Sequence, residues 1–83
     1  MRDASLAQQL GILIRQLRLQ HGMSQELFAD RCSLHRTYIG SIERGEKTIT
    51  VETAHKIALA LNMPLSQMFF LLEATQQGFI DEK

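Results

Sequence analysis

Apolar residues recur at spacings of three and four along most of the chain, and this spacing places them on one face of an α-helix. The clearest stripe lies in residues 5–21, and Gly22 follows it as a residue suited to end a helix. A second clear stripe lies between Thr50, which can cap a helix, and Asn62, which can end one. No segment shows the period of two that predicts a strand. The apolar positions of the two stripes are Leu6, Leu10, Leu13, Ile14 and Leu17, followed by Val51, Ala54, Ile57, Ala58 and Leu61.

Two shorter helices are predicted between these stripes, separated by a very short break. The first ends near Cys32, and the second begins at Leu34 or His35 and stops at Gly45. A fifth helix is predicted around Pro64, because the missing N–H of proline is harmless in the first turn of a helix. The predicted fold class is therefore all-α, with five helices joined by short loops.

The whole chain, residues 1–83, is predicted to form one domain, with its core in about residues 6–72 and a C-terminal tail in about residues 73–83. Hydrophobic residues make up 45% of the chain and charged residues 22%, which is ordinary for a soluble globular domain. The longest apolar run, residues 68–72, is far shorter than the ~20 residues of a membrane span. The N-terminal residues do not resemble a signal peptide. We therefore expect a soluble, cytoplasmic protein with no membrane partner.

The charges are balanced overall but unevenly placed. Nine basic residues match nine acidic ones, which does not fit the strongly basic balance of a nonspecific nucleic-acid coat. Residues 31–47 are nevertheless locally basic, and the residues from Glu73 onward are mainly acidic. This distribution favours contact with a polyanion at one face. The locally basic segment carries Arg31, Arg36, Arg44 and Lys47 against Glu43 and Glu46.

The two short helices have the features of a helix-turn-helix. Helices joined by so short a break cross at a steep angle, and a small residue such as Ala29 is needed where they touch. The second helix would project outward and could enter the major groove of DNA with its N-terminal residues on the base edges. Arg36 could donate two hydrogen bonds to guanine, and Thr37 could contact a base edge or a thymine methyl group. The residues predicted to contact bases or phosphates are Ser24, Gln25, Arg36, Thr37, Tyr38, Ser41, Arg44, Lys47 and Thr48.

Six of these residues have a second interpretation. Arg36 could be an ordinary solvated arginine, and Thr37 and Ser41 could be surface polar residues. Tyr38 could be a core aromatic residue with its hydroxyl group at the rim of the domain. Arg44 and Lys47 could be cations that interact favourably with the C-terminal end of the helix dipole.

Segments 23–29 (MSQELFA) and 34–45 (LHRTYIGSIERG) resemble the helix-turn-helix of the phage-repressor (Cro/C1, or Xre) family. The similarity extends over about residues 6–72 and implies a five-helix, lambda-repressor-like DNA-binding domain. Within the family, the short length and the string RTYI most resemble the controller proteins of restriction–modification systems, which are small dimeric regulators of their own operators. The resemblance implies common DNA contacts at Gln25, Arg36, Thr37 and Ser41, and at Arg44 in some members.

The resemblance also implies a buried ion pair between Arg18 and Glu43, which would join the first helix to the end of the recognition helix. Two positions depart from the family pattern. Ser33 stands where glycine is usual at the turn, so the turn would carry strain of about 1 kcal/mol or take another shape. Pro64 stands where a capping serine is usual, so the start of the last helix would depend on packing and on the fixed φ of proline.

The fifth helix has more apolar residues than one core-facing stripe needs. Residues 68–72 are consecutive and cover more than one face of a helix, so part of that surface would be exposed in a monomer. The family resemblance assigns the final helix to dimerisation, and a monomer with an unusually apolar last helix is the alternative. The predicted dimer interface consists of Met68, Phe69, Phe70, Leu72 and Phe79.

These observations predict a homodimeric, sequence-specific transcriptional regulator that binds a two-fold symmetric DNA operator. The narrower resemblance implies autoregulation of a restriction–modification operon. RNA polymerase would be a further partner if Glu26 or Asp30 belonged to an activating acidic patch. The alternative is a protein-interaction module, similar to an antitoxin, that uses the helix-turn-helix as a scaffold.

An enzyme is not expected, because the chain lacks a nucleophile–base pair and a phosphate-binding loop. Neither a metal ion nor a cofactor is expected, since His21, His35 and His55 are scattered without a second set of ligands. Cys32 is the only cysteine and cannot form an intramolecular disulfide; it is predicted to be a small buried residue rather than a redox switch.

Overall fold

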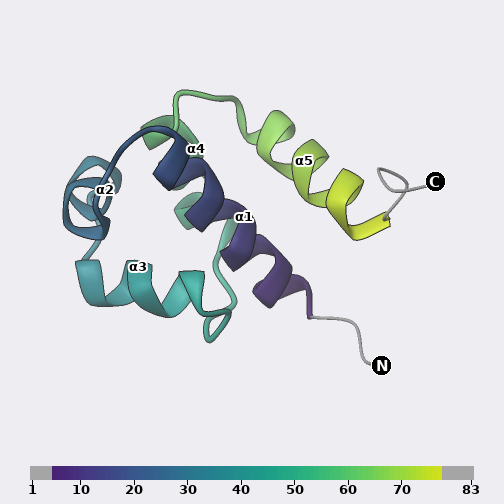
Figure 1. Ribbon diagram of the computed structural model, residues 1–83, viewed down its shortest axis with the longest axis horizontal. Coiled ribbons are helices and arrows are strands. Elements are labelled where there is room, and N and C mark those ends of the chain that lie inside the picture. Colours follow the sequence, from purple (N-terminus) through teal and green to yellow (C-terminus); the bar gives the residue numbers. More distant parts are fainter. Residues whose placement is uncertain (1–4, 78–83) are drawn as a thin grey trace.

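A computed structural model describes residues 5–77 of the protein. These residues form five helices and, among them, no strand, which confirms the predicted fold class (Figure 1). The fifth helix runs to Gln77 and so includes the first residues of the segment assigned to the tail, among which Ala74 is buried. The helices are α1 (Leu6–Gln20), α2 (Gln25–Cys32), α3 (Arg36–Glu43), α4 (Val51–Ala60) and α5 (Leu65–Gln77).

The helices begin at residues whose side chains satisfy the first free N–H groups. Ser5 Oγ accepts from the backbone N–H of Gln8 at 3.1 Å, and the Gln8 side chain accepts from the backbone N–H of Ser5 at 2.9 Å. Ser24 and Thr50 cap α2 and α4 in the simpler one-way manner. Pro64 differs from the prediction: it lies just before α5 instead of in its first turn, and its carbonyl accepts the N–H of Gln67 at 3.0 Å.

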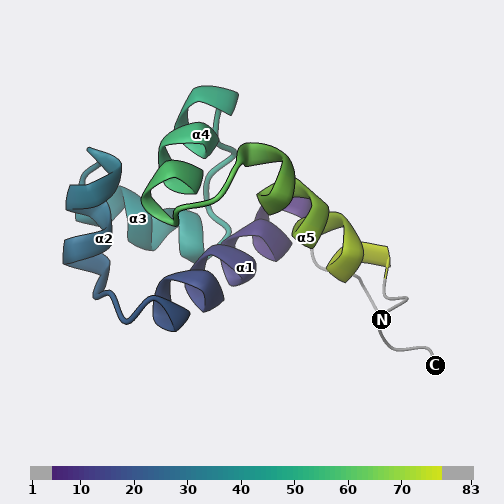
Figure 2. The same ribbon diagram turned by 90° about the horizontal axis from the view of Figure 1, so that it is seen from above.

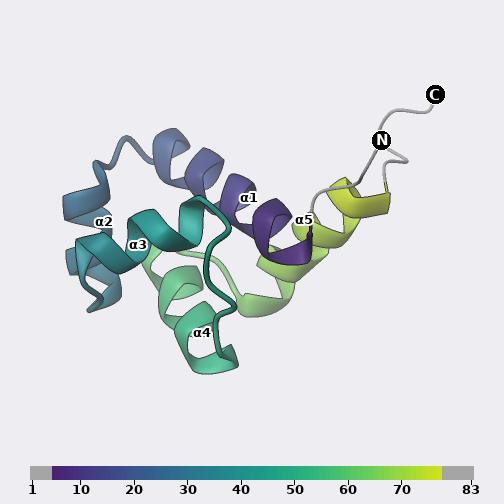
Figure 3. The same ribbon diagram turned by 90° about the horizontal axis from the view of Figure 1, so that it is seen from below.

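One fully buried side chain from each helix meets in a single core. Figures 2 and 3 show α1 lying between α3 on one side and α5 on the other. Cys32 lies in the same core, and its burial raises the pKa of the thiol to about 11, as expected of a packing residue. The five side chains, in helix order, are Ile14, Phe28, Ile39, Ile57 and Met68.

A glycine in the middle of α1 sets the distance to α3. A Cβ atom at Gly11 would contact the carbonyl oxygen of Ile42 and lie 2.8 Å from that of Glu43. Real Cβ atoms do not approach backbone oxygen so closely, so only glycine lets α1 lie directly against the C-terminal end of α3. This contact fixes the depth at which α3 lies in the domain.

In the described part of the chain, no single helix is long and apolar enough to cross a membrane. The stretches Val51–Ala60 and Leu65–Thr75 reach that length and composition only as a pair, and the pair is bent by 99°.

Candidate nucleic-acid interface

The turn between α2 and α3 takes the left-handed shape without glycine. Ser33 has φ 59° and ψ 41°, and the N–H of Leu34 donates to the carbonyl oxygen of Ala29 at 2.9 Å. Of the two outcomes expected for Ser33, the structure therefore has the conformation that glycine would favour. An L-residue in this region carries a cost of about 1–2 kcal/mol, which the packing of the two helices must outweigh.

α3 has one face in the core and the other in solvent, and it lies along an outer edge of the molecule beside α2 (Figures 1 and 3). Ile39 and Ile42 are buried, whereas Arg36 and Thr37 are exposed at the N-terminal end of the helix. His35 Nδ1 accepts the backbone N–H of Thr37 at 3.2 Å and so fixes where the helix starts. This end of α3 is the part that a recognition helix presents to base edges.

Ser41, for which the sequence analysis predicted a DNA contact, has little exposed surface. It is only 9% exposed, and its hydroxyl group donates to the carbonyl oxygen of Thr37 at 3.1 Å. Four residues along an α-helix correspond to a rotation of about 40°, so Ser41 lies on the same side of α3 as Thr37, away from the buried Ile39. Tyr38 is half-buried and packs against the core.

The Glu43 carboxylate is the centre of a buried hydrogen-bond network behind α3. Arg18 Nε donates to Glu43 Oε2 at 2.6 Å, and Arg18 Nη2 donates to Oε1 at 3.0 Å. Arg18 Nη1 donates to the carbonyl oxygen of Met23 at 2.8 Å, and Gln25 Nε2 donates to Glu43 Oε1 at 3.0 Å. The network therefore ties α1, the turn after it, α2 and α3 together through one carboxylate.

This network also orients Gln25, which is exposed at the start of α2. Because Nε2 uses one hydrogen to bind Glu43, the amide oxygen and one N–H remain available to an outside partner. Gly40 lies beside this residue: a Cβ atom there would be in ordinary contact with Gln25 Oε1 at 3.8 Å and would press on Arg44 Nη1 at 3.2 Å.

Both arginines of the outer surface have a glutamate beside them, which the sequence analysis did not predict. Arg36 Nη1 lies 3.3 Å from Glu26 Oε2, and both side chains are mostly exposed. Arg44 makes two bonds with Glu46, from Nε to Oε2 at 2.9 Å and from Nη2 to Oε1 at 3.3 Å. These hydrogen bonds raise the pKa of Arg44 and lower the pKa of Glu46 from their ordinary values. The first pair joins residues ten apart on two helices, so only the crossing of α2 and α3 brings them together.

The other predicted DNA contacts lie at the two ends of the helix-turn-helix. Ser24 is exposed before α2, and its hydroxyl oxygen accepts the N–H of Leu27 at 3.0 Å. Lys47 and Thr48 are exposed in the loop that follows α3. Lys47 makes no ion pair with any residue in the described part of the chain, so its ammonium group is accessible to an anion.

Only part of the predicted dimer surface is available on α5. Met68 is 0% exposed and Leu72 is 6% exposed, so the prediction that they lie at an interface is wrong. Their spacing of four places both on the face that packs into the domain's own core. Phe70 is 65% exposed, whereas Phe69 is partly buried. Phe79, the remaining interface prediction, lies outside the described residues.

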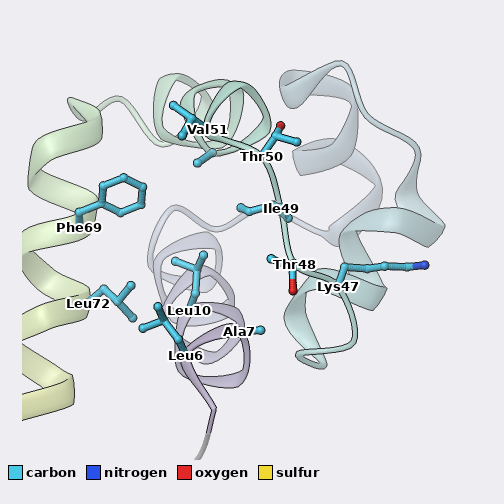
Figure 4. A pocket seen from close by; sticks show the side chains of 11 residues that line it. Leu6, Ala7, Leu10, Lys47, Thr48, Ile49, Thr50, Val51, Phe69 and Leu72 are labelled. Atoms are coloured by element: carbon cyan, nitrogen blue, oxygen red, sulfur yellow. The ribbon is translucent and has the colours of Figure 1, made fainter.

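An apolar cavity of about 280 Å³ opens beside Phe69. Figure 4 shows Phe69 and Leu72 on α5 facing Leu6 and Leu10 on α1 across this cavity, with the segment 47–51 closing its far side. The Lys47 side chain extends away from the cavity, which leaves a lining that is mainly hydrocarbon. An apolar side chain is the kind of group that fits such a cavity.

Among the described residues, no group of three or more His, Cys, Asp or Glu side chains is placed to hold a metal ion. The functional features that sequence reasoning missed are Gly11 and the two glutamates, Glu26 and Glu46. An isolated glycine inside a helical stripe was a usable signal for the first. No spacing rule could have identified the partner of Arg36.

Comparison with known proteins gives one consistent result. The helix-turn-helix family matches residues 14–68 of the chain. The control protein C.BamHI of Bacillus amyloliquefaciens is 42% identical over 74 residues, which cover 88% of each protein.

Two solved structures extend this similarity to three dimensions. The restriction–modification controller protein C.AhdI of Aeromonas hydrophila has a TM-score of 0.73 and 33% identity, covering 76% of this chain and 96% of that one. The controller protein C.Esp1396I, solved as a tetramer in complex with its natural 35 base-pair operator, has a TM-score of 0.77 and 31% identity, covering 84% of this chain and 92% of that one.

Proposed function

The chain belongs to the helix-turn-helix family that includes the controller proteins of restriction–modification systems, and from this premise we propose that it is a transcriptional regulator that binds operator DNA as a homodimer. The observation that carries the proposal is the exposed N-terminal end of α3. Arg36 and Thr37 point into solvent there, while Glu43 anchors the opposite side of the helix in the core. A recognition helix needs this combination of an open polar face and a fixed position.

The proposed contacts divide into two kinds. Arg36 and Thr37 contact base edges, and Lys47 and Thr48 contact phosphates and set the register of the helix on the duplex. Gln25 contacts DNA through the part of its amide that Glu43 leaves free. Ser24 contributes from the N-terminal end of α2, where backbone N–H groups attract phosphate.

The proposed dimer places two α3 helices one turn of DNA apart, about 34 Å, on a two-fold symmetric operator. Phe70 and the cavity beside Phe69 support this arrangement, because both are on α5 and a two-fold axis brings identical surfaces together. Val51 and Leu6 are exposed at the cavity rim and add apolar area to the proposed interface.

We further propose a cytoplasmic location and control of a restriction–modification operon. Contact of Glu26 or Asp30 with RNA polymerase stays a prediction.

Selection of DNA by the purified chain from a random pool tests the proposal. We expect an enriched two-fold symmetric sequence.

Arg36→Ala should then weaken binding to that sequence by about 1–3 kcal/mol and relax the preference at one base position. Lys47→Ala should weaken binding to all sequences alike and reduce the salt slope by about one. Lys56→Ala removes an exposed cation on α4 and serves as the control.

A pool without an enriched sequence would contradict the regulator and favour the protein-interaction module instead. Unchanged binding in both Arg36→Ala and Lys47→Ala would contradict the assigned contacts.

The dimer is tested by sedimentation of Phe70→Glu, which places a charge on the exposed face of α5. We expect a shift toward the monomer, because an unpaired charge is costly inside an interface. Leu59→Glu is the matched control, since Leu59 is similarly exposed but lies at the C-terminal end of α4. Equal masses for Phe70→Glu and the unchanged protein would remove Phe70 from the interface.

A further inference from the structure

The two arginines on the outer surface of α3 are paired with glutamates in different ways. Arg36 uses one nitrogen, Nη1, in a single contact with Glu26. Arg44 uses two nitrogens, Nε and Nη2, in a two-bond contact with both oxygens of Glu46. We propose that the two glutamates therefore have opposite effects on DNA binding: Glu26 orients Arg36 for its base contact, whereas Glu46 competes with DNA for Arg44. This inference rests on the proposed function.

Arg36 can bind DNA without leaving its glutamate. A guanidinium group has five N–H donors, and the contact with Glu26 leaves the Nε and Nη2 edge free. That edge has the fork geometry that fits the O6 and N7 acceptors of guanine. Glu26 lies in the first turn of α2, so its carboxylate is attached to a rigid element and restricts the directions that the guanidinium can take.

Arg44 must exchange its partner before it can bind DNA in the same way. Its Nε and Nη2 donors both point at Glu46, so the edge that would contact a phosphate or guanine is occupied. Nη1 remains free for a single hydrogen bond, but a two-bond contact through the Nε and Nη2 edge requires that edge to be released. A phosphate or guanine that binds Arg44 through this edge therefore has to displace the Glu46 carboxylate.

The accessible charge of the interface is smaller than the sequence implies. Glu26 and Glu46 are both exposed and oppose the two arginines, while Glu43 is paired with Arg18 in the interior. Phosphates repel exposed carboxylates. An arginine that is already paired with a glutamate also contributes no contact that would release counterions from the DNA. Glu46 thus lowers the affinity for DNA of any sequence, while Glu26 favours the operator over other DNA.

The experiment compares single variants of the full chain on two duplexes of equal length, the operator obtained by selection and a scrambled sequence. Binding is measured by fluorescence anisotropy between about 50 and 300 mM KCl. Glu46→Ala should raise the affinity for both duplexes by about three- to tenfold and steepen the salt slope by about one. Glu73→Ala removes an exposed carboxylate from α5, which α1 separates from α3, and should change neither value.

Two variants of Glu26 separate orientation from charge, because they lose the same charge and differ only in a hydrogen-bond acceptor. Glu26→Ala should reduce the preference for operator over scrambled DNA by about three- to tenfold. Glu26→Gln keeps an oxygen for Arg36 and should retain that preference within about twofold. Equal behaviour of these two variants would overturn the orienting role.

A double variant tests the competition directly. If Glu46 acts through Arg44, then Glu46→Ala should give a clearly smaller gain in affinity in a chain that already carries Arg44→Met than in the unchanged chain. The same gain in both backgrounds, or no gain from Glu46→Ala alone, would overturn the competition. Absence of any preference for the operator in the unchanged protein would instead refute the proposed function, so the two failures are distinguishable.

Discussion

The two sides of α3 both have arginine–glutamate pairs, and the pairs differ in their surroundings. Behind the helix, the side chains of Arg18 and Glu43 are 7% and 2% exposed and are joined by two hydrogen bonds, of 2.6 and 3.0 Å. On the outer side, Arg36 and Glu26 are 64% and 75% exposed and make one longer contact. An unpaired charge in the interior destabilises the folded state strongly, whereas at the surface water can replace the lost partner of a charged side chain. The inner pair therefore holds the helix in place, and the outer pairs can exchange partners.

The largest expected effect comes from breaking the inner pair. Glu43→Ala leaves the Arg18 guanidinium buried without a carboxylate and should lower the free energy of unfolding by about 3–5 kcal/mol. The total stability of a domain is only about 5–15 kcal/mol, so much of this variant should be unfolded on warming. Urea denaturation followed by circular dichroism measures the loss. Glu46→Ala is the outer-side control and should change stability by less than about 0.5 kcal/mol; equal losses would contradict the comparison.

A smaller effect is expected where α1 touches the inner side of α3. Gly11→Ala should lower the free energy of unfolding by about 1–3 kcal/mol, because the new methyl group meets the backbone of Glu43. Elsewhere in a helix, the same exchange stabilises by roughly 0.5–1 kcal/mol, so the sign of the change is informative. Thermal unfolding measures it, with the exposed Gln16→Ala on the same helix as a control. A stabilised Gly11→Ala would show that α1 and α3 can move apart at no cost.

The smallest expected effect concerns the turn that sets the angle of α3. Ser33→Gly should raise the free energy of unfolding by up to about 1 kcal/mol, since glycine adopts the left-handed conformation freely. Asn62→Gly is the matched comparison: Asn62 has φ 62°, but asparagine tolerates this region better, so the gain should be smaller. A loss of stability in Ser33→Gly would mean that the serine makes a compensating contribution.

Much of the fold was accessible from local patterns. The apolar stripes identified α1 and α4, boundary residues and Pro64 identified the other three helices, and Gly22 and Asn62 end α1 and α4 with positive φ, as expected. Errors arose where one helix had more than one plausible inner face. The sequence of the apolar run 68–72 does not show which of its residues face the core. Packing of α5 against α1 and α4 places Met68 and Leu72 in the core and leaves Phe70 in solvent.

The sequence by itself determined the helical architecture, the helix-turn-helix and the exposed end of α3, because periodicity, caps and turn residues act over a few neighbouring positions. Only the tertiary structure decided that Ser41 has little exposed surface, that Gly11 is the contact point with α3, and that Glu26 lies beside Arg36. These features depend on how two helices cross, and a crossing brings together residues that no local spacing relates.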